Sequence, residues 1–519
     1  MRGMRTFKPY DPDQAYLLAP DLRAWLPEGH LALFISDVVD ALDLSPILED
    51  YERGDGRGQP PYHPVMMVKL LVYGYCTGKT SSRKIEKATW EDVAYRVLAA
   101  NQNPDHDSIS EFRKRHLASL AGLFVQVLLL CQKAGLVKLG HVAIDGSKVK
   151  ANASKHKAMS YQRMNETEER LKKEVEALLA EAQRVDDAED AQHGKGKRGD
   201  ELPDELARRE SRLKKIQQAK AALEAEAKAK AQAQAEEARE RIANRERQET
   251  ETGTKIGGTP PRIPDPEQAI PDQKAQKNFT DAESRIMLDG ATKSFVQAYN
   301  VQVAVDSASQ IIVATAVTQD ANDKKQLTPL LEGVHANLGR LPENTSADSG
   351  YFSENAVNNP QIAGTSLHVP PGREKTEDVV EGRSVASSPA TVVAGNTTPC
   401  DDSARTPAKP PSAAEQMREK LRTAAGHAVY KMRKAIVEPV FGQIKQVRGF
   451  RQFSFRGLAR VSAEWDLVSL THNLLKLFRS GWQPINRLRH RGSEEQNRQG
   501  EPEISNLRTK QPGLTPSPA

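Results

Sequence analysis

The chain has 519 residues, long enough for more than one domain, and 28% of them are charged while 5% are aromatic. Its formal net charge of +5 permits a nucleic-acid partner without requiring one. Cys76, Cys131 and Cys400 stand far apart with no Cys-x2-Cys spacing, which argues against a disulfide framework or a zinc ribbon and suits a reducing compartment. No apolar run reaches membrane-spanning length, and the first residues lack the apolar core of a signal peptide. We therefore expect a cytoplasmic protein without a membrane partner.

The N-terminal region predicts an extended segment over residues 1–28, where prolines recur, and then short helices over residues 29–136. One apolar helix is bounded by Pro64 at its start and by Gly78 just past its end. Proline fits the first turn of a helix and glycine fits the residue after its last turn, so these bounds have a local physical cause.

Two further helices in this region are predicted to begin with capping boxes, at residues 89–92 (Thr-Trp-Glu-Asp) and 108–111 (Ser-Ile-Ser-Glu). The second box precedes a basic helix that carries Arg113, Lys114 and Arg115. Short helices with one basic member are compatible with a DNA-binding helix-turn-helix unit. A plain helical bundle whose Arg113 face is solvated is an equal alternative.

Residues 159–250 are rich in Ala, Glu, Lys and Arg and carry apolar residues at heptad spacing in two stretches, broken near residues 191–200. This pattern predicts an antiparallel helical hairpin. The Pro- and Gly-rich residues 251–276 form a linker back to the main domain.

The segment His141–Lys150 predicts a short buried strand, Val142–Ile144, that ends in Asp145 and is followed by glycine and two lysines, one of which is Lys148. A carboxylate closing a buried strand costs free energy unless a cation or hydrogen bonds compensate it. A divalent cation is one such partner, and the lysines indicate an anionic ligand. A common Asp-Gly turn is the alternative.

The second half of the chain predicts two hairpin strands, Phe295–Asp306 and Gln310–Thr318, followed by Asp323 as the N-cap of a helix. Long helices are expected over Met417–Arg448 and Leu458–Phe478, and Trp465 in the latter is expected in the core.

Two more carboxylates stand in unusual surroundings. Asp348 lies in a glycine-containing turn, 203 residues after Asp145, and Glu438 lies among apolar residues 90 residues later. Lys445 follows Glu438 by seven residues on the same helix face and could bind a phosphate or form an ion pair with Glu438. Mg²⁺ prefers hard oxygen ligands and needs few carboxylates when phosphate supplies the rest. Asp306, at the end of another predicted strand, is an alternative to Asp348 as the second metal-binding carboxylate.

Four blocks together resemble DDE-type transposases of bacterial insertion sequences, in particular a subgroup with a helical N-terminal domain and a long helical insertion after the first Asp. The blocks are residues 141–154, 278–302, 347–351 and 437–445. The resemblance implies an α/β fold: an RNase H-like mixed sheet flanked by helices, with an all-α N-terminal domain and an inserted helical hairpin. The catalytic domain would then comprise residues 137–158, 277–371 and 416–480, interrupted by an irregular insertion at 372–415 and followed by a disordered tail at 481–519.

The resemblance implies Asp145, Asp348 and Glu438 as the catalytic and metal-binding acids, with two Mg²⁺ ions or Mn²⁺ as a substitute. It also implies binding of double-stranded DNA at the element's terminal inverted repeats, endonuclease cleavage, strand transfer to target DNA, a homodimer on DNA and a nucleoid-associated location. The basic residues expected to contact DNA are Lys445, Lys434, Lys148, Arg113, Lys114 and Arg115.

One departure from the resemblance concerns the helix around the glutamate. Related transposases carry a Tyr-x2-Arg-x3-Glu-x6-Lys pattern. Here Glu438-x6-Lys445 fits, but Lys434 stands at the expected arginine position, while Arg433 and Tyr430 lie one residue off register.

Three functions follow from these residues. An active transposase is the leading hypothesis. A catalytically inactive, transposase-derived DNA-binding protein would bind the repeats without cleaving them, and an RNase H-like nuclease would nick DNA without joining it.

Overall fold

The computed structural model describes residues 22–52, 60–193, 204–255, 257–290, 292–372 and 411–484. Several predictions therefore lie outside the described residues: most of the extended segment 1–28, most of the break at 191–200, nearly all of the insertion 372–415, most of the tail 481–519, and Cys400. Cys76 and Cys131 are buried free thiols.

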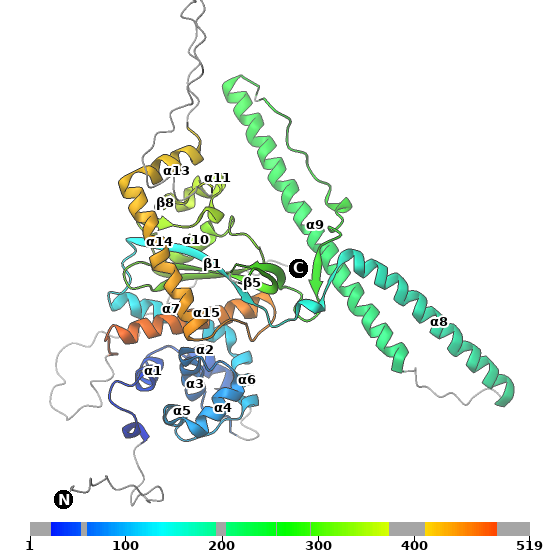
Figure 1. The fold of residues 1–519 in the computed structure, drawn as a ribbon, viewed down its shortest axis with the longest axis horizontal. Helices are drawn as coiled ribbons and strands as arrows, with labels where there is room; N and C mark the ends of the chain where they lie inside the picture. The colour runs from blue at the N-terminus through cyan, green and yellow to red at the C-terminus, as the bar shows by residue number, and fades with distance from the viewer. Residues whose placement is uncertain are drawn as a thin grey trace, which may run out of the picture.

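The N-terminal region is helical, as predicted (Figure 1). Its elements are η1 (Leu22–Trp25), α1 (Leu31–Asp40), α2 (Ser45–Glu52), α3 (Pro64–Thr77), α4 (Ser82–Glu91), α5 (Val93–Leu98), α6 (His106–Arg115) and α7 (Leu117–Lys133).

The bounds of α3 are confirmed, because Pro64 occupies its first turn and Gly78 adopts the left-handed conformation just past its end. Both capping boxes were wrong. Thr89 lies inside α4, and Asp92 caps α5 by accepting from the Ala94 amide. Likewise Ser108 lies inside α6, and Asp105 caps that helix by accepting from the Ser108 amide. Aspartate is at least as good an N-cap as serine or threonine, and in both helices an aspartate three residues away from the expected cap takes that position.

A mixed sheet with the strand order β4-β5-β1-β7-β8, in which β6 also pairs with β5, forms the centre of the molecule. Strand β1 pairs antiparallel with β5 and parallel with β7, which pairs parallel with β8. The strands are β1 (His141–Lys150), β4 (Arg285–Asp289), β5 (Ser294–Asp306), β6 (Ile312–Thr318), β7 (Asn344–Ser346) and β8 (Ser366–His368).

Strand β1 does not end at Asp145, as the sequence predicted, but continues to Lys150. Its pairing with β5 runs from Val142 opposite Asp306 to Lys150 opposite Ala298, so Asp145 lies in mid-strand opposite Val303. The polar residues after Ile144 stay in the strand because long-range pairing satisfies their backbone groups, which local sequence does not reveal.

Helices of the second half cover the sheet. They are α10 (Leu327–Leu338), α11 (Glu354–Val357), α13 (Ala413–Arg422), α14 (Ala424–Gly442) with the π-helical turn η6 (Gln443–Val447), and α15 (Leu458–Arg479), with short turns η4 (Ser349–Tyr351) and η5 (Pro360–Ile362). Helix α14 crosses β1, and α15 lies between the sheet and the N-terminal helices (Figure 1).

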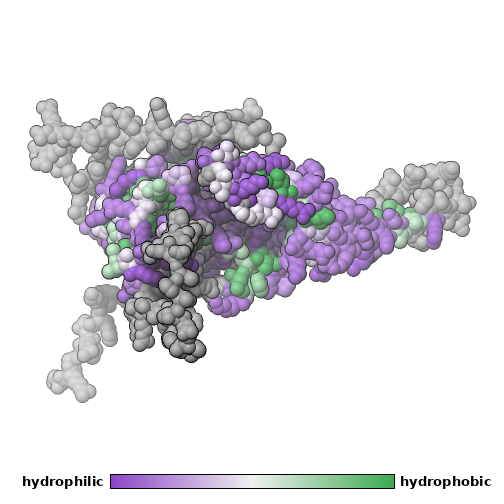
Figure 2. Space-filling model, turned by 90° about the horizontal axis from the view of Figure 1, so that it is seen from above, coloured by the Kyte–Doolittle hydropathy of each residue, from purple (hydrophilic) through white to green (hydrophobic). Residues whose placement is uncertain are grey.

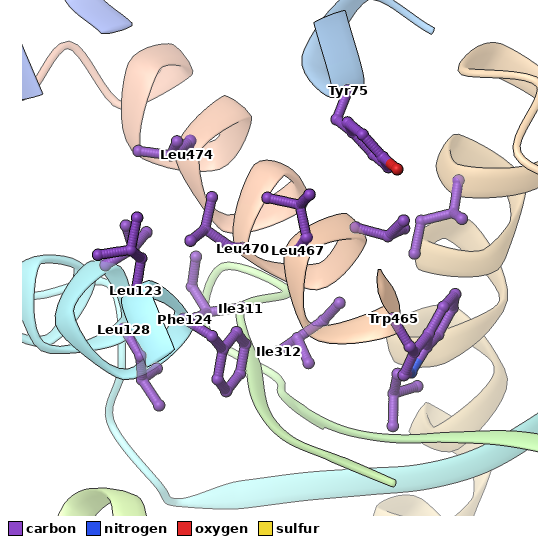
Figure 3. Packing of buried hydrophobic residues seen from close by; sticks show 14 of the residues in the cluster. Tyr75, Leu123, Phe124, Leu128, Ile311, Ile312, Trp465, Leu467, Leu470 and Leu474 are labelled. Atoms are coloured by element: carbon purple, nitrogen blue, oxygen red, sulfur yellow. The ribbon is translucent and has the colours of Figure 1, made fainter. Parts of the chain in front are cut away.

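The core continues from the sheet into the N-terminal helices. Figure 3 shows α15 contributing Trp465, Leu467, Leu470 and Leu474, with Tyr75 of α3 on one side and Phe124 of α7 and Ile312 of β6 on the other. Trp465 is fully buried, which confirms its predicted core position. One hydrophobic core therefore fixes the N-terminal helices against the sheet.

The inserted hairpin comprises β2 (Ala158–Ser160), α8 (Tyr161–His193), α9 (Asp204–Thr252), η3 (Pro266–Gln268) and β3 (Gln276–Asn278), with η2 (Lys155–Lys157) before it. Its helices pack through a small cluster of their own: Met164, Leu171, Ile216, Ala219 and Leu223. The hairpin extends away from the body, and the face visible in Figure 2 is mostly hydrophilic there.

The predicted α/β class, with its helical N-terminal region and mixed sheet, is confirmed. Among the described residues no single helix is long and apolar enough to cross a membrane, although α6 and α7 would meet the length and composition together with a 70° bend between them.

Candidate active site

Asp145 and Asp348 come together through the parallel pairing of β1 with β7. Ala143 pairs with Ser346 at the end of this ladder, and Asp145 and Asp348 each lie two positions further along their own segments. Each carboxylate accepts from a nearby backbone amide, Gly146 at 2.8 Å and Gly350 at 2.9 Å. Two carboxylates 203 residues apart in sequence thus face one site.

Arg433 of α14 brings a positive charge to this pair. Its guanidinium Nη1 lies 3.2 Å from Oδ2 of Asp145, and its side chain is only 10% exposed. The Tyr430 ring lies 6.0 Å from the same guanidinium. These two residues lie one position off the register expected from the sequence, yet Arg433 is the residue that α14 directs at Asp145, with Tyr430 beside it.

Burial raises the pKa of Asp145 to about 6, against the opposing effect of Arg433, and Asp348 and Asp323 raise that pKa further. Burial also lowers the pKa of Lys148, whose charge the same three aspartates favour. Five charged side chains therefore act on one another in this partly buried region: Asp145, Asp348, Asp323, Lys148 and Arg433. Lys148 lies among the acids.

Asp323 is a site residue that the sequence analysis missed. It was predicted to cap a helix, but α10 begins at Leu327 with Gln326 as its N-cap. The Asp323 carboxylate instead accepts from Asn300 Nδ2 at 2.7 Å and Gln302 Nε2 at 2.6 Å. The signal available was the pair of polar residues, Asn300 and Gln302, within an otherwise apolar strand.

Glu438 lies on the exposed side of α14, and among the described residues no hydrogen bond or ion pair joins it to Asp145, Asp348 or Lys445. Helix geometry explains this. Glu438 follows Arg433 by five residues, which places the two side chains roughly 140° apart around the helix. Glu438 therefore leaves α14 on a different side from Arg433.

The predicted basic contacts near the acids have different surroundings. Lys445 donates to Ser147 Oγ and, at 2.7 Å, to the Lys148 carbonyl, so its ammonium is tied to β1. Burial lowers the pKa of Lys445. Lys434 is exposed on α14.

In the N-terminal region Arg113 has an internal role that its predicted DNA contact did not anticipate. It is 7% exposed, donates to the Thr80 carbonyl at 2.7 Å and to the Tyr75 hydroxyl at 3.3 Å, and lies over the Phe455 ring. The solvated Arg113 face of the alternative interpretation is not observed either.

The other two basic residues of α6 lie nearer the surface. Lys114 pairs with Glu111, and Arg115 pairs with Asp50; both are more than half exposed.

Asp306, the alternative to Asp348 as a ligand, has a structural role. It is fully buried, and its carboxylate accepts from the amides of Lys138, Leu139 and Ala308. These bonds occupy both carboxylate oxygens at the far end of β5, so the structure disfavours Asp306 as a ligand.

The donor chemistry of Asp145 and Asp348 fits Mg²⁺ or Mn²⁺, because both offer hard carboxylate oxygens and Mg²⁺ is commonly held by one or two carboxylates with water and phosphate. Within the described ranges, no group of three or more His, Cys, Asp or Glu residues is already arranged to hold a metal ion. The fit is therefore to a two-carboxylate site completed by other ligands.

Comparison with known protein families gives two matches. Residues 20–115 match a family described as a transposase domain (DUF772), and residues 403–478 match a family described as a transposase DDE domain. Neither the curated proteins nor the solved structures gave a match. The first match covers η1 and α1 to α6 but not α7, and the second covers α13, α14, η6 and nearly all of α15. Together these matches and the mixed α/β fold support assignment of the chain to the DDE-type insertion-sequence transposases.

Proposed function

We propose that this transposase binds double-stranded DNA at the ends of an insertion sequence and catalyses metal-dependent cleavage and strand transfer. The observation that carries the proposal is that Asp145 and Asp348 each lie two positions beyond the parallel pairing of β1 with β7, with Arg433 3.2 Å from Asp145. Carboxylates beside cationic side chains suit a phosphodiester substrate, since they can hold cations while the basic groups attract phosphate.

Asp145 and Asp348 would hold the divalent cations, and Glu438 is proposed as a further ligand from α14. When bound, two such cations stabilise the attacking and leaving oxygens of an in-line phosphoryl displacement. Arg433 balances the charge of Asp145, and Lys445 holds the backbone of Lys148. The Lys148 ammonium would then contact a phosphate of the DNA.

Around this centre, exposed Lys434, Lys114 and Arg115 would contact the DNA backbone. A dimer on DNA and a cytoplasmic, nucleoid-associated location complete the proposal.

The test is cleavage and joining of DNA that carries the element ends, by the full-length protein in Mg²⁺ or Mn²⁺. Asp145→Asn and Asp348→Asn should abolish both products, because an amide holds a divalent cation far more weakly than a carboxylate. Asp320→Asn is the matched control: it makes the same charge change at an exposed position.

Each outcome of this assay distinguishes one of the three hypotheses from the others. Unchanged cleavage by Asp145→Asn would refute the proposed site. Nicked but unjoined DNA would indicate a nuclease, and repeat binding without metal-dependent cleavage would indicate an inactive derivative. Glu438→Gln tests the third acid separately, because it leaves the two aspartates intact.

A further inference from the structure

Helices α3 and α4 are connected as in a helix-turn-helix unit, which DNA-binding proteins use to place the second helix in the major groove. Residues 78–81 join the two helices, and Gly78 opens this turn in the left-handed conformation with a φ of +79°. A turn of three or four residues that contains glycine is typical of such units. Helix α4 therefore occupies the place of the DNA-reading helix.

Buried contacts hold one side of α4 against the rest of the N-terminal helices. Ile85 is fully buried against α3, where a Cβ on Gly74 would lie 3.1 Å from Ile85 Cδ1. The turn before α4 is held by Arg113 of α6, which donates to the Thr80 carbonyl at 2.7 Å. Figure 1 shows α4 on the part of the N-terminal region that lies away from the sheet. Its opposite side is therefore held in a fixed orientation toward the solvent.

The exposed side of α4 carries three basic side chains: Arg83, Lys84 and Lys87. In the described part of the chain neither Arg83 nor Lys84 takes part in an ion pair or a side-chain hydrogen bond, and Lys87 pairs only with exposed Glu91, at 3.6 Å. An exposed pair of this kind contributes little to stability and is easily exchanged for another partner. The positive charge of α4 is thus available to a polyanion such as DNA.

Helix α6, which the sequence predicted as the basic DNA-binding helix, presents a weaker basic surface. Arg113 is buried inside the N-terminal region. The two exposed basic residues, Lys114 and Arg115, already have acidic partners in Glu111 and Asp50. The structure therefore favours α4 over α6 as the helix that reads DNA.

Three side chains on the exposed side of α4 suit contact with base edges. Arg83, Lys87 and Trp90 follow one another at spacings of four and three, so they share one helix face. Arg83 lies in the first turn, the part of a recognition helix that meets the bases. Arginine and lysine donate to the two major-groove acceptors of guanine, and an apolar side chain contacts the thymine methyl. The Trp90 indole is 66% exposed and can make such a contact.

We propose that α4 enters the major groove of the end DNA and reads its base sequence through Arg83, Lys87 and Trp90. The inference rests on the proposed function and names the helix that distinguishes element ends from other DNA. The family match over residues 20–115 assigns no role to this helix. A helix with its side chains is about 10–12 Å wide, which fits a major groove about 12 Å wide.

The experiment compares the affinities of the full-length protein for two duplexes, without divalent cations so that no strand is cut. One duplex carries the element end, and the other has the same bases in scrambled order. Arg83→Ala and Lys87→Ala should each lower the ratio of the two affinities at least about fivefold, the lower end of the discrimination that one base contact gives. Both residues are exposed, so the unfolding temperature should stay near that of the wild type.

Lys114→Ala is the matched control on α6. It removes the same charge from an exposed helix position, and loss of a phosphate contact weakens binding to both duplexes alike, so the ratio should not change. Trp90→Ala removes no charge. It should lower the ratio while the salt dependence of binding stays that of the wild type.

Two results would overturn the role of α4 alone: an unchanged ratio in folded Arg83→Ala and Lys87→Ala, or an equal fall of the ratio in Lys114→Ala. In both cases the wild type still prefers the end duplex, so the proposed function stands. A wild type that binds the two duplexes equally would overturn the proposed recognition of element ends as well.

Discussion

Replacing Arg113 should destabilise the fold, because the residue is part of a buried polar network that joins the N-terminal helices to α15. Its guanidinium donates to the Tyr75 hydroxyl, which donates to Glu464 Oε1 at 2.9 Å. Glu464 is fully buried and also accepts from the amides of Ser454 and Phe455. Burial raises the pKa of Glu464, and Arg113 opposes that rise.

The expected loss for Arg113→Gln is about 3 kcal/mol in the free energy of unfolding at pH 7. Removing one partner of a buried charge pair costs roughly 3–5 kcal/mol, and the lower end applies because Tyr75 stands between the two charges. Lys114→Gln on the same helix is the control. Its side chain is 54% exposed and pairs with Glu111 at 3.5 Å, so its effect should stay within about 0.5 kcal/mol.

Urea unfolding followed by circular dichroism measures both variants. The penalty of Arg113→Gln should shrink as the pH falls through the raised pKa of Glu464, because a protonated carboxyl needs no counter-charge. A variant as stable as the wild type that has lost DNA affinity would refute this reasoning. Such a result would instead support the expectation from the sequence that Arg113 contacts DNA.

Three further outcomes are expected. Burial raises the pKa of Asp466 from an ordinary 3.8 to about 6, so ionisation of this carboxyl destabilises the fold by up to about 3 kcal/mol. The stability of Asp466→Asn relative to the wild type should therefore increase as the pH rises from 4 to 7, measured by thermal unfolding of both proteins at a series of pH values. Gly78→Ala should lower the free energy of unfolding more than Gly135→Ala does. Both glycines have positive φ, where a side chain costs about 1–2 kcal/mol, but only at Gly78 would a Cβ also meet a backbone oxygen, that of Arg448 at 2.6 Å. Equal losses of stability in urea unfolding would contradict this reasoning. Affinity for end DNA should fall with salt by about 0.9 in the log–log slope per neutralised phosphate, and a flat response in a binding titration would argue against a backbone interface.

Features with local causes could be predicted from the sequence. Pro64 and Gly78 bound α3 as expected, since proline at a helix start and glycine past its end act within a few residues. Helix starts were less predictable where several caps competed. Asp105 and Ser108 are both good N-caps, and the sequence alone does not rank them.

Features that depend on strand pairing could be predicted only in part. Asp145 and Asp348 were identified as candidates, but β1 was expected to end at Asp145, because its pairing with β5 through Lys150 is a long-range property. Asp323 was missed for the same reason. Its local pattern suits a helix cap, and only the fold shows that the buried amides of Asn300 and Gln302 reach it.

The position of Glu438 shows how one additional residue between two helix positions changes a site. In the Tyr-x2-Arg-x3-Glu pattern of related transposases, Arg and Glu are four residues apart and lie within roughly 40° on one helix face. Arg433 and Glu438 are five residues apart, so their side chains leave α14 in directions roughly 140° apart. In this structure Arg433 is the one that pairs with Asp145. The extra residue therefore separates the arginine from the glutamate, and Glu438→Gln tests the glutamate without removing the Arg433–Asp145 ion pair.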